Sequence, residues 1–134
     1  MLSDNFIQSI IETVSKYEKI VLCYIFGSSI KSDEYNDIDL GILLSNSSPI
    51  YDITKFSMEI GRLVEKSLNF QKVIDVKILN HSPIYFQFEV ISKGVLVYLK
   101  SEKERITYEK GVISSHLDYK DTFDWFNTQI IERV

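Results

Sequence analysis

The composition is that of one compact globular domain. The chain has 134 residues, of which 45% are hydrophobic and 25% charged, with only 5 Gly and 2 Pro. A chain of this length buries its own core without disulfides, and its apolar content excludes a disordered or collagen-like protein. No apolar run reaches the roughly 20 residues of a membrane helix, and no signal-peptide pattern opens the sequence. We therefore expect a cytoplasmic protein without membrane contacts.

Charge and cysteine content exclude further classes. Lys and Arg total 15 against 19 Asp and Glu, a net charge of -4, which disfavours direct binding to nucleic acid. The single cysteine, Cys23, excludes an internal disulfide. Because it lies in an apolar run, we expect a small buried hydrophobe there instead of a reactive thiol.

The first elements follow from apolar spacing. Residues behind Ser3 repeat at helical spacing and predict an amphipathic helix to about Tyr17. The run 20–26 is β-branched and aromatic and has the length of a strand, which Gly27 ends. Residues 37–44 form a second predicted strand.

The remaining elements predict a mixed sheet. A helix at about 52–68, capped by Asp52, is followed by a strand at 72–79. Next come a short helix, with Ser82 as its cap, Pro83 as its first residue and Gly94 as its stop, and a strand at 95–100. In the last predicted helix, Ser101 and Glu104 have capping-box spacing and Gly111 is a weak point. This order indicates an α+β fold in which helices cover a mixed sheet of about four strands. We expect one domain, 1–134, with a core of about 1–100 and a C-terminal helical segment of about 102–133.

Two acidic residues in the second strand are the strongest chemical signal. Asp37 and Asp39 are two apart, so they share one face of the strand. Like charges at that distance repel unless a cation lies between them, and carboxylate oxygens are ligands that Mg²⁺ prefers. Gly41, on the same face, is expected to leave room for a ligand. A pair of solvent-facing acids is the simpler alternative.

A third carboxylate, Asp75, lies in the otherwise apolar strand 72–79. An acid there is costly unless it is paired or binds a metal. If this strand pairs beside the second one, three carboxylates converge, enough for two Mg²⁺ ions bridged by substrate phosphates. The alternative is an edge-strand acid paired with Lys72 or Lys77.

The end of the first strand offers a phosphate site. At Gly27 and Ser28, backbone N–H groups and a hydroxyl can approach phosphate oxygens. An ordinary turn at the end of a strand is the alternative.

Together these residues carry a family resemblance. Gly27-Ser28, Asp37-x-Asp39 and Asp75 resemble the signature of the DNA polymerase β-type nucleotidyltransferase superfamily in its minimal form, and in particular the MNT antitoxins that pair with HEPN ribonuclease toxins. The resemblance covers most of residues 1–100. The spacer between Ser28 and Asp37 is shorter than in the antitoxins and lacks their arginine.

The resemblance implies a role for each residue. Asp37, Asp39 and Asp75 are the expected catalytic residues and metal ligands, and Asp75 also helps to deprotonate the attacking hydroxyl. The expected nucleotide-binding residues are Gly27, Ser28, Ser29 and Lys31, the last as a point charge in place of the missing arginine.

The implied function is that of an enzymatic antitoxin. Such a protein of a type VII-like HEPN/MNT pair would transfer AMP from MgATP to a tyrosine hydroxyl of the cognate HEPN toxin, with which it would form a hetero-oligomer. Two alternatives stay open, namely an antitoxin that occludes its toxin with a degenerate site and a nucleotidyltransferase acting on a small molecule.

The C-terminal aromatic residues allow two interpretations. They pack the last helix onto the sheet, or part of their surface binds a partner. The residues are Tyr108, Tyr119, Phe123, Trp125 and Phe126. His81 and His116 have no ligand-like neighbours in sequence, and we assign them no role.

Overall fold

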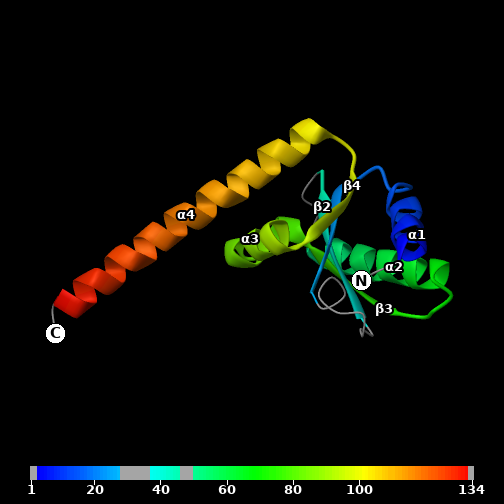
Figure 1. Cartoon of the computed structure of the whole chain (residues 1–134), viewed down its shortest axis with the longest axis horizontal. Helices are drawn as coiled ribbons and strands as arrows, with labels where there is room; N and C mark the ends of the chain where they lie inside the picture. The colour runs from blue at the N-terminus through cyan, green and yellow to red at the C-terminus, as the bar shows by residue number, and fades with distance from the viewer. Residues whose placement is uncertain (1–2, 28–36, 46–49, 133–134) are drawn as a thin grey trace.

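The computed structural model describes residues 3–27, 37–45 and 50–132, and its order of helices and strands is the predicted one (Figure 1). The elements are α1 (Asp4–Val14), β1 (Ile20–Phe26), β2 (Asp37–Leu44), α2 (Ile50–Ser67), β3 (Val73–Ile78), the 3-10 turn η2 (Leu79–His81), α3 (Ile84–Lys93), β4 (Val95–Leu99) and α4 (Glu102–Glu132). No helix in the described part of the chain is long and apolar enough to cross a membrane.

The four strands form one mixed sheet in the order β3-β2-β1-β4. β1 pairs antiparallel with both β2 and β4, whereas β2 and β3 are parallel. A parallel pair needs a long crossover connection, which α2 supplies. The predicted mixed sheet is confirmed, including the pairing of β3 beside β2.

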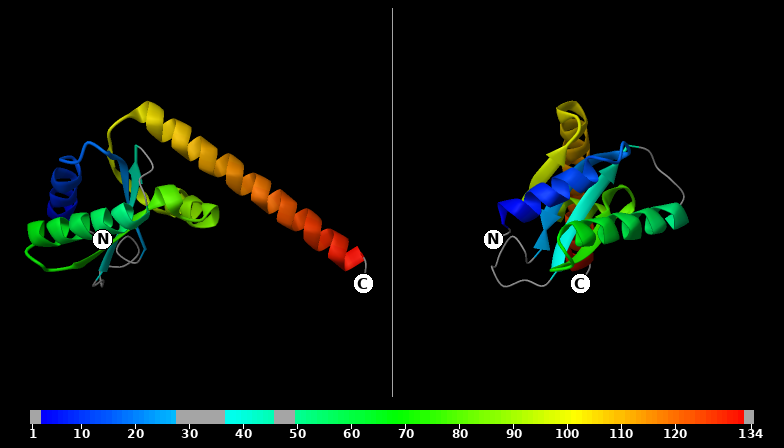
Figure 2. Two further views of the ribbon diagram at one scale, coloured as in Figure 1. Left: turned by 180° about the vertical axis from the view of Figure 1, so that it is seen from behind. Right: turned by 90° about the vertical axis from the view of Figure 1, so that its right-hand side faces the viewer.

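Helices cover both faces of the sheet (Figures 1 and 2). α1 and α2 lie on one face, over a core to which β2 contributes Ile38, Leu40 and Ile42. α3 and the first part of α4 lie on the other face, over a smaller cluster that includes Tyr24 and Val90. Because side chains alternate along a strand, the odd-numbered residues of β2 face the α3 side.

Several helix boundaries differ from the predictions. α1 ends at Val14 instead of about Tyr17, although Ser3 caps it by accepting a hydrogen bond from Phe6 N. α2 begins at Ile50, so Asp52 lies in the first turn, where its charge favours the helix amino end. The capping-box spacing at the start of α4 is confirmed on one side, because Glu104 N donates to Ser101 Oγ at 3.2 Å.

Pro83 is the N-cap of α3, in place of Ser82. The η2 turn precedes it, and the hydroxyl of Ser82 donates to Ile78 O at 2.9 Å, so this side chain closes the turn and does not cap the helix. Gly94 is the C-cap, as predicted.

α4 is anchored at its start and extends beyond α3 (Figure 1). The hydroxyl of buried Tyr24 donates to Glu109 Oε1 at 2.6 Å, and Tyr108 Oη donates to Gln87 Oε1 at 2.7 Å. Tyr108 therefore packs the helix onto the rest of the fold. The helix continues through Gly111 without a break.

The other C-terminal aromatic residues divide into two groups. Tyr119 is 62% exposed. The side chains of Phe123, Trp125 and Phe126 lie outside the described part of the structure, so the partner-binding interpretation stays a prediction for them.

Cys23 is a buried hydrophobe, as predicted. Its side chain is fully buried in the sheet core, and this burial raises the pKa of the thiol to about 12. At neutral pH the thiol is therefore protonated, which disfavours reactivity.

Candidate functional site

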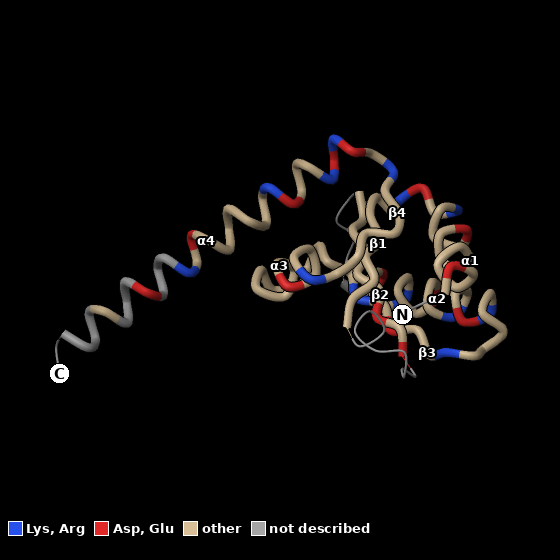
Figure 3. The backbone as a smooth tube through the Cα atoms, viewed as in Figure 1, with Lys and Arg blue, Asp and Glu red and all other residues tan. Residues whose placement is uncertain are grey.

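The three predicted carboxylates lie at one end of the sheet on neighbouring strands. Asp37 and Asp39 come from β2, and the parallel register places Asp39 directly opposite Asp75 of β3. Ile74 of β3 packs into the core under α2, so Asp75 faces the α3 side together with Asp39. Figure 3 shows acidic positions close together on the backbone near the β2 label.

The carboxylates repel one another. The pKa of Asp39 is raised, first by partial burial and then by the negative charges of Asp75 and Asp37. Lys77 offsets part of this repulsion. Its ammonium lies 3.7 Å from Asp75 Oδ2, but both side chains are about half exposed, so the ion pair is weak.

The donor set suits a hard divalent cation. Three carboxylates whose negative charge Lys77 offsets only in part are the kind of oxygen ligands that Mg²⁺ selects. Within residues 3–27, 37–45 and 50–132, no three Asp, Glu, His or Cys side chains are already arranged around a common metal position. The fit therefore rests on the type, number and electrostatics of the donors.

Gly27 lies against Asp39. Its φ of +83° is in the left-handed region, and a Cβ atom there would overlap Asp39 Oδ2. Phe26 is the register partner of Asp39, which brings the turn after β1 to the carboxylate. Glycine is thus required at this position for two independent reasons.

Three of the predicted nucleotide-binding residues cannot be placed. Ser28, Ser29 and Lys31 lie outside the described residues. Of the predicted phosphate-binding turn, the structure describes Gly27 alone.

The expectation of open space at Gly41 is wrong. A Cβ atom there would lie 3.1 Å from Val90 Cγ1 and 3.3 Å from Leu79 Cδ2, because α3 and the η2 turn pack closely over this part of β2. Gly41 serves this close packing. Phe26 and Phe86 form an edge-to-face pair, with ring centroids 5.5 Å apart, on the same face of the sheet.

Two features of the site escaped the sequence analysis. The steric dependence of Asp39 on Gly27 has no sequence signal beyond a glycine after a strand. The second feature is that Lys77 lies near Asp39, which follows only from the register of β2 and β3. The spacing of Asp75 and Lys77, two residues apart, indicates only that these two side chains share a face of β3.

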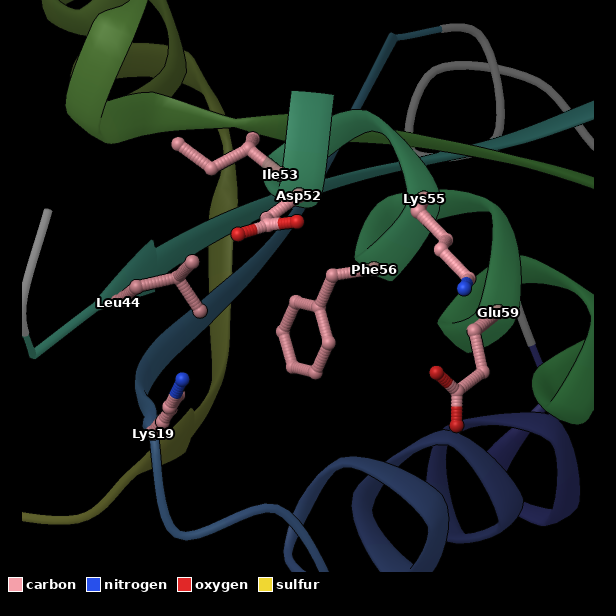
Figure 4. A pocket seen from close by; sticks show the side chains of 7 residues that line it. All are labelled: Lys19, Leu44, Asp52, Ile53, Lys55, Phe56 and Glu59. Atoms are coloured by element: carbon pink, nitrogen blue, oxygen red, sulfur yellow. The ribbon is translucent and has the colours of Figure 1, made fainter. Parts of the chain in front are cut away.

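A separate cavity of about 220 Å³ lies between α2 and the start of β1 (Figure 4). It is lined by Lys19, Leu44, Asp52, Ile53, Lys55, Phe56 and Glu59. Leu44 pairs with Ile20, whereas Asp39 pairs with Phe26 at the opposite end of β1. This cavity is therefore distinct from the carboxylate site.

Family and structural comparisons agree with this geometry. The family model "Polymerase beta, Nucleotidyltransferase" matches residues 8–103, a range that contains Gly27 and all three carboxylates. The chain belongs to this nucleotidyltransferase family. No curated protein sequence matches the chain.

Several solved structures share the fold. An MNT antitoxin in complex with a tri-AMPylated Shewanella oneidensis HEPN toxin gives a TM-score of 0.70 at 16% identity, covering 94% of this chain and 96% of that one. A toxin–antitoxin structure with AMP-PNP gives 0.73 at 17% identity, covering 93% and 98%. A MntA–HepT structure gives 0.72 at 15% identity, covering 96% and 99%. At these identities the likeness establishes the fold.

Proposed function

We propose that this protein is an adenylyltransferase antitoxin, which transfers AMP from MgATP to a tyrosine hydroxyl of a HEPN-type toxin and thereby inactivates it. The observation that carries the proposal is the register pairing of Asp39 with Asp75 beside Asp37, in a chain of the nucleotidyltransferase family. The structural neighbours support the choice of acceptor, because they include a tri-AMPylated HEPN toxin with its MNT antitoxin and a complex with AMP-PNP.

Each carboxylate has a role in the proposed reaction. Asp37 and Asp39 hold the metal-bound triphosphate, and Asp75 accepts the proton of the attacking hydroxyl. When bound by these residues, Mg²⁺ neutralises charge on the phosphates and lowers the pKa of the hydroxyl. The hydroxyl oxygen forms a bond to the α-phosphorus, the bond to the outer phosphates breaks, and pyrophosphate leaves.

The glycine turn binds the outer phosphates in this scheme. Backbone N–H groups at Gly27 and the hydroxyls of Ser28 and Ser29 donate to phosphate oxygens, and Lys31 adds a positive charge. The pKa of Asp39 is raised first by burial and then by the charges of Asp75 and Asp37, and a bound cation would relieve the repulsion among these carboxylates, which supports a cation-binding role.

The acceptor is supplied by a partner. The chain acts as a single domain, 1–134, in which the core of about 1–100 carries the reaction and the C-terminal segment of about 102–133 contributes to the partner interface. Exposed apolar side chains on α4, such as Ile106 and Leu117, support that division. We place the reaction in the cytoplasm, where ATP and the RNA targets of a ribonuclease occur.

Mass spectrometry of the native pair tests the proposal. The toxin is captured from the source cell and incubated with this protein, ATP and Mg²⁺, and the intact masses of both proteins are recorded. We expect the toxin to gain the mass of one or more AMP units with the native protein and none with Asp39→Ala.

Two results would contradict the proposal. A stable complex with both masses unchanged, whose toxin is silenced equally by Asp39→Ala, would indicate occlusion. Transfer of AMP only to a small molecule would indicate a different acceptor class.

A further inference from the structure

Lys77 brings a positive charge to the carboxylate cluster, which is the group formed by Asp37, Asp39 and Asp75. Its ammonium lies 3.7 Å from Asp75 Oδ2, and the two side chains share one face of β3 because they are two residues apart. The parallel register places Lys77 opposite Gly41, two residues along the strands from the pair of Asp39 and Asp75. The lysine therefore approaches the cluster from the edge strand of the sheet.

The charge of Lys77 reaches a second carboxylate. Burial, and after it the charges of the other two carboxylates, raise the pKa of Asp39, whereas the charge of Lys77 lowers it. Lys77 thus stabilises the ionised form of Asp39 without a metal, which is also the effect that a bound cation has. In the metal-free protein the ammonium takes over part of the electrostatic role of the metal ion.

The ion pair of Lys77 and Asp75 is weak enough to be exchanged. The two side chains are 53% and 51% exposed, so solvent screens their attraction. The flexible stem of lysine lets the ammonium move into solvent without a change in the backbone. A divalent cation bound to the same carboxylate would be repelled by an ammonium that stayed in place. The metal and the ammonium therefore exclude each other at Asp75.

We propose that Lys77 is the resident counter-ion of the carboxylate cluster and that a metal ion displaces its ammonium from Asp75 in order to bind there. This inference rests on the proposed function, in which the cluster holds Mg²⁺, and adds a control on when the site is loaded. The lysine-paired Asp75 and the metal-binding Asp75, which the sequence presents as alternatives, are then two states of the same residue.

The exchange makes metal binding depend on the nucleotide. Displacing the ammonium costs free energy, so Lys77 weakens the binding of free Mg²⁺. A triphosphate carries negative charge into the site, which offsets the repulsion between the metal and the ammonium. Lys77 therefore favours metal ions that arrive together with the nucleotide over free ones.

Thermal unfolding midpoints at increasing Mg²⁺ concentration, without nucleotide or toxin, test the inference, because a ligand that binds the folded state raises the midpoint. Native protein is compared with Lys77→Met, Lys77→Arg and Lys103→Met. We expect Lys77→Met to bind Mg²⁺ about two- to five-fold more tightly than native protein, the range that corresponds to an exposed ion pair. Lys77→Arg keeps the positive charge and should restore the weaker native affinity.

Lys103→Met is the matched control. Lys103 is exposed and lines a pocket together with Leu44 and Ser45, at the end of β2 opposite to Asp37. The variant makes the same change in net charge away from the cluster, so it should bind Mg²⁺ like native protein.

The stability of Lys77→Met separates a counter-ion from a merely structural residue. In EDTA this variant should unfold at a lower temperature than native protein, because the carboxylates lose their counter-ion. In saturating Mg²⁺ the two midpoints should coincide, since the ammonium is displaced in native protein as well. A structural role of the lysine would lower the midpoint equally under both conditions.

A second Mg²⁺ titration contains the ATP analogue AMP-PNP. The difference in Mg²⁺ affinity between native protein and Lys77→Met should shrink here, because the triphosphate offsets the repulsion. A difference that persists undiminished would overturn the preference for metal ions that arrive with the nucleotide.

Three further results would overturn the inference as a whole. These are an equal Mg²⁺ affinity of native protein and Lys77→Met, a weaker affinity of Lys77→Met, and a loss of stability that is the same in EDTA and in saturating Mg²⁺. Native protein whose midpoint responds to Mg²⁺ neither alone nor with AMP-PNP would contradict the proposed function itself, so the two failures are distinguishable.

Discussion

The backbone of Gly27 lies directly against the carboxylate of Asp39, and this contact joins the turn after β1 to the acidic end of β2. Asp39 Cγ would be only 3.2 Å from a Cβ atom at position 27, with one of its oxygens closer still. The left-handed φ of Gly27 adds a second constraint. The position of the Asp39 carboxylate therefore depends on a residue without a side chain.

Replacing Gly27 by Ala is expected to displace Asp39 and abolish most of the activity. A misplacement of about 1 Å in a catalytic site costs about 100-fold in rate. The left-handed conformation adds about 1–2 kcal/mol of destabilisation. AMP transfer to the toxin and urea unfolding measure the two effects, and unchanged transfer by Gly27→Ala would contradict the steric role.

Gly111→Ala is the matched glycine replacement and is expected to stabilise the protein. Gly111 is inside α4, and a Cβ atom there meets nothing within 4 Å. Alanine in a helix interior is more stable than glycine by about 0.5–1 kcal/mol. Urea unfolding should give an increase of that size, and a decrease in stability would be inconsistent with an exposed position on a continuous helix.

Asp39→Asn is expected to stabilise the metal-free protein in a pH-dependent way. Because the pKa of Asp39 is raised in the folded state, the folded protein binds more protons than the unfolded one between the two pKa values. Stability is therefore lost as the pH rises through that window, and asparagine avoids this loss.

The thermal unfolding midpoint, measured in EDTA from about pH 3 to about pH 7, tests this prediction, because this range spans the ordinary pKa of a carboxyl group. The advantage of Asp39→Asn over native protein should be absent at the acidic end and grow to a plateau toward neutral pH. Parallel curves across the range would show that neither burial nor repulsion raises the pKa of Asp39 in the folded state.

Tyr24→Phe is expected to weaken the anchoring of α4. Tyr24 is 2% exposed, and its hydroxyl donates to Glu109 Oε1. Loss of the hydroxyl leaves Glu109 with Arg105 as its remaining partner, at a cost of about 1–3 kcal/mol.

Tyr85→Phe is the control for this change, because Tyr85 is 63% exposed. Surface replacements of this kind are usually within about 0.5 kcal/mol. Equal unfolding midpoints for Tyr24→Phe and Tyr85→Phe would contradict the anchoring role of the Tyr24 hydroxyl.

The sequence predicts β1 and β2 with the observed boundaries, because β1 stops before Gly27 and β2 stops before the turn-forming residues that begin at Ser45. The convergence of Asp75 with Asp39 follows once the parallel pairing is known. That pairing is a long-range property, so the sequence alone indicates the convergence only on the condition that the two strands are neighbours.

Two features could not be predicted because neighbouring structure overrides the signal of the residue itself. The sequence predicts open space at Gly41, but α3 and the η2 turn bring Val90 and Leu79 over it. The η2 turn also engages Ser82 and transfers the N-cap of α3 to Pro83. At Gly41 the local signal is overridden by elements distant in the sequence, whereas at Ser82 it is overridden by the adjoining turn, to which the Ser82 hydroxyl donates.

The most direct test of the central claim follows the phosphorus atoms of ATP. The native protein and its toxin are incubated with Mg²⁺ and ATP labelled at either the α-phosphate or the γ-phosphate, with EDTA and Asp39→Asn reactions in parallel. We predict that the toxin retains α-label and no γ-label, and that EDTA or Asp39→Asn removes the signal. Retention of γ-label, or α-label that persists with Asp39→Asn, would contradict adenylyl transfer by the three carboxylates.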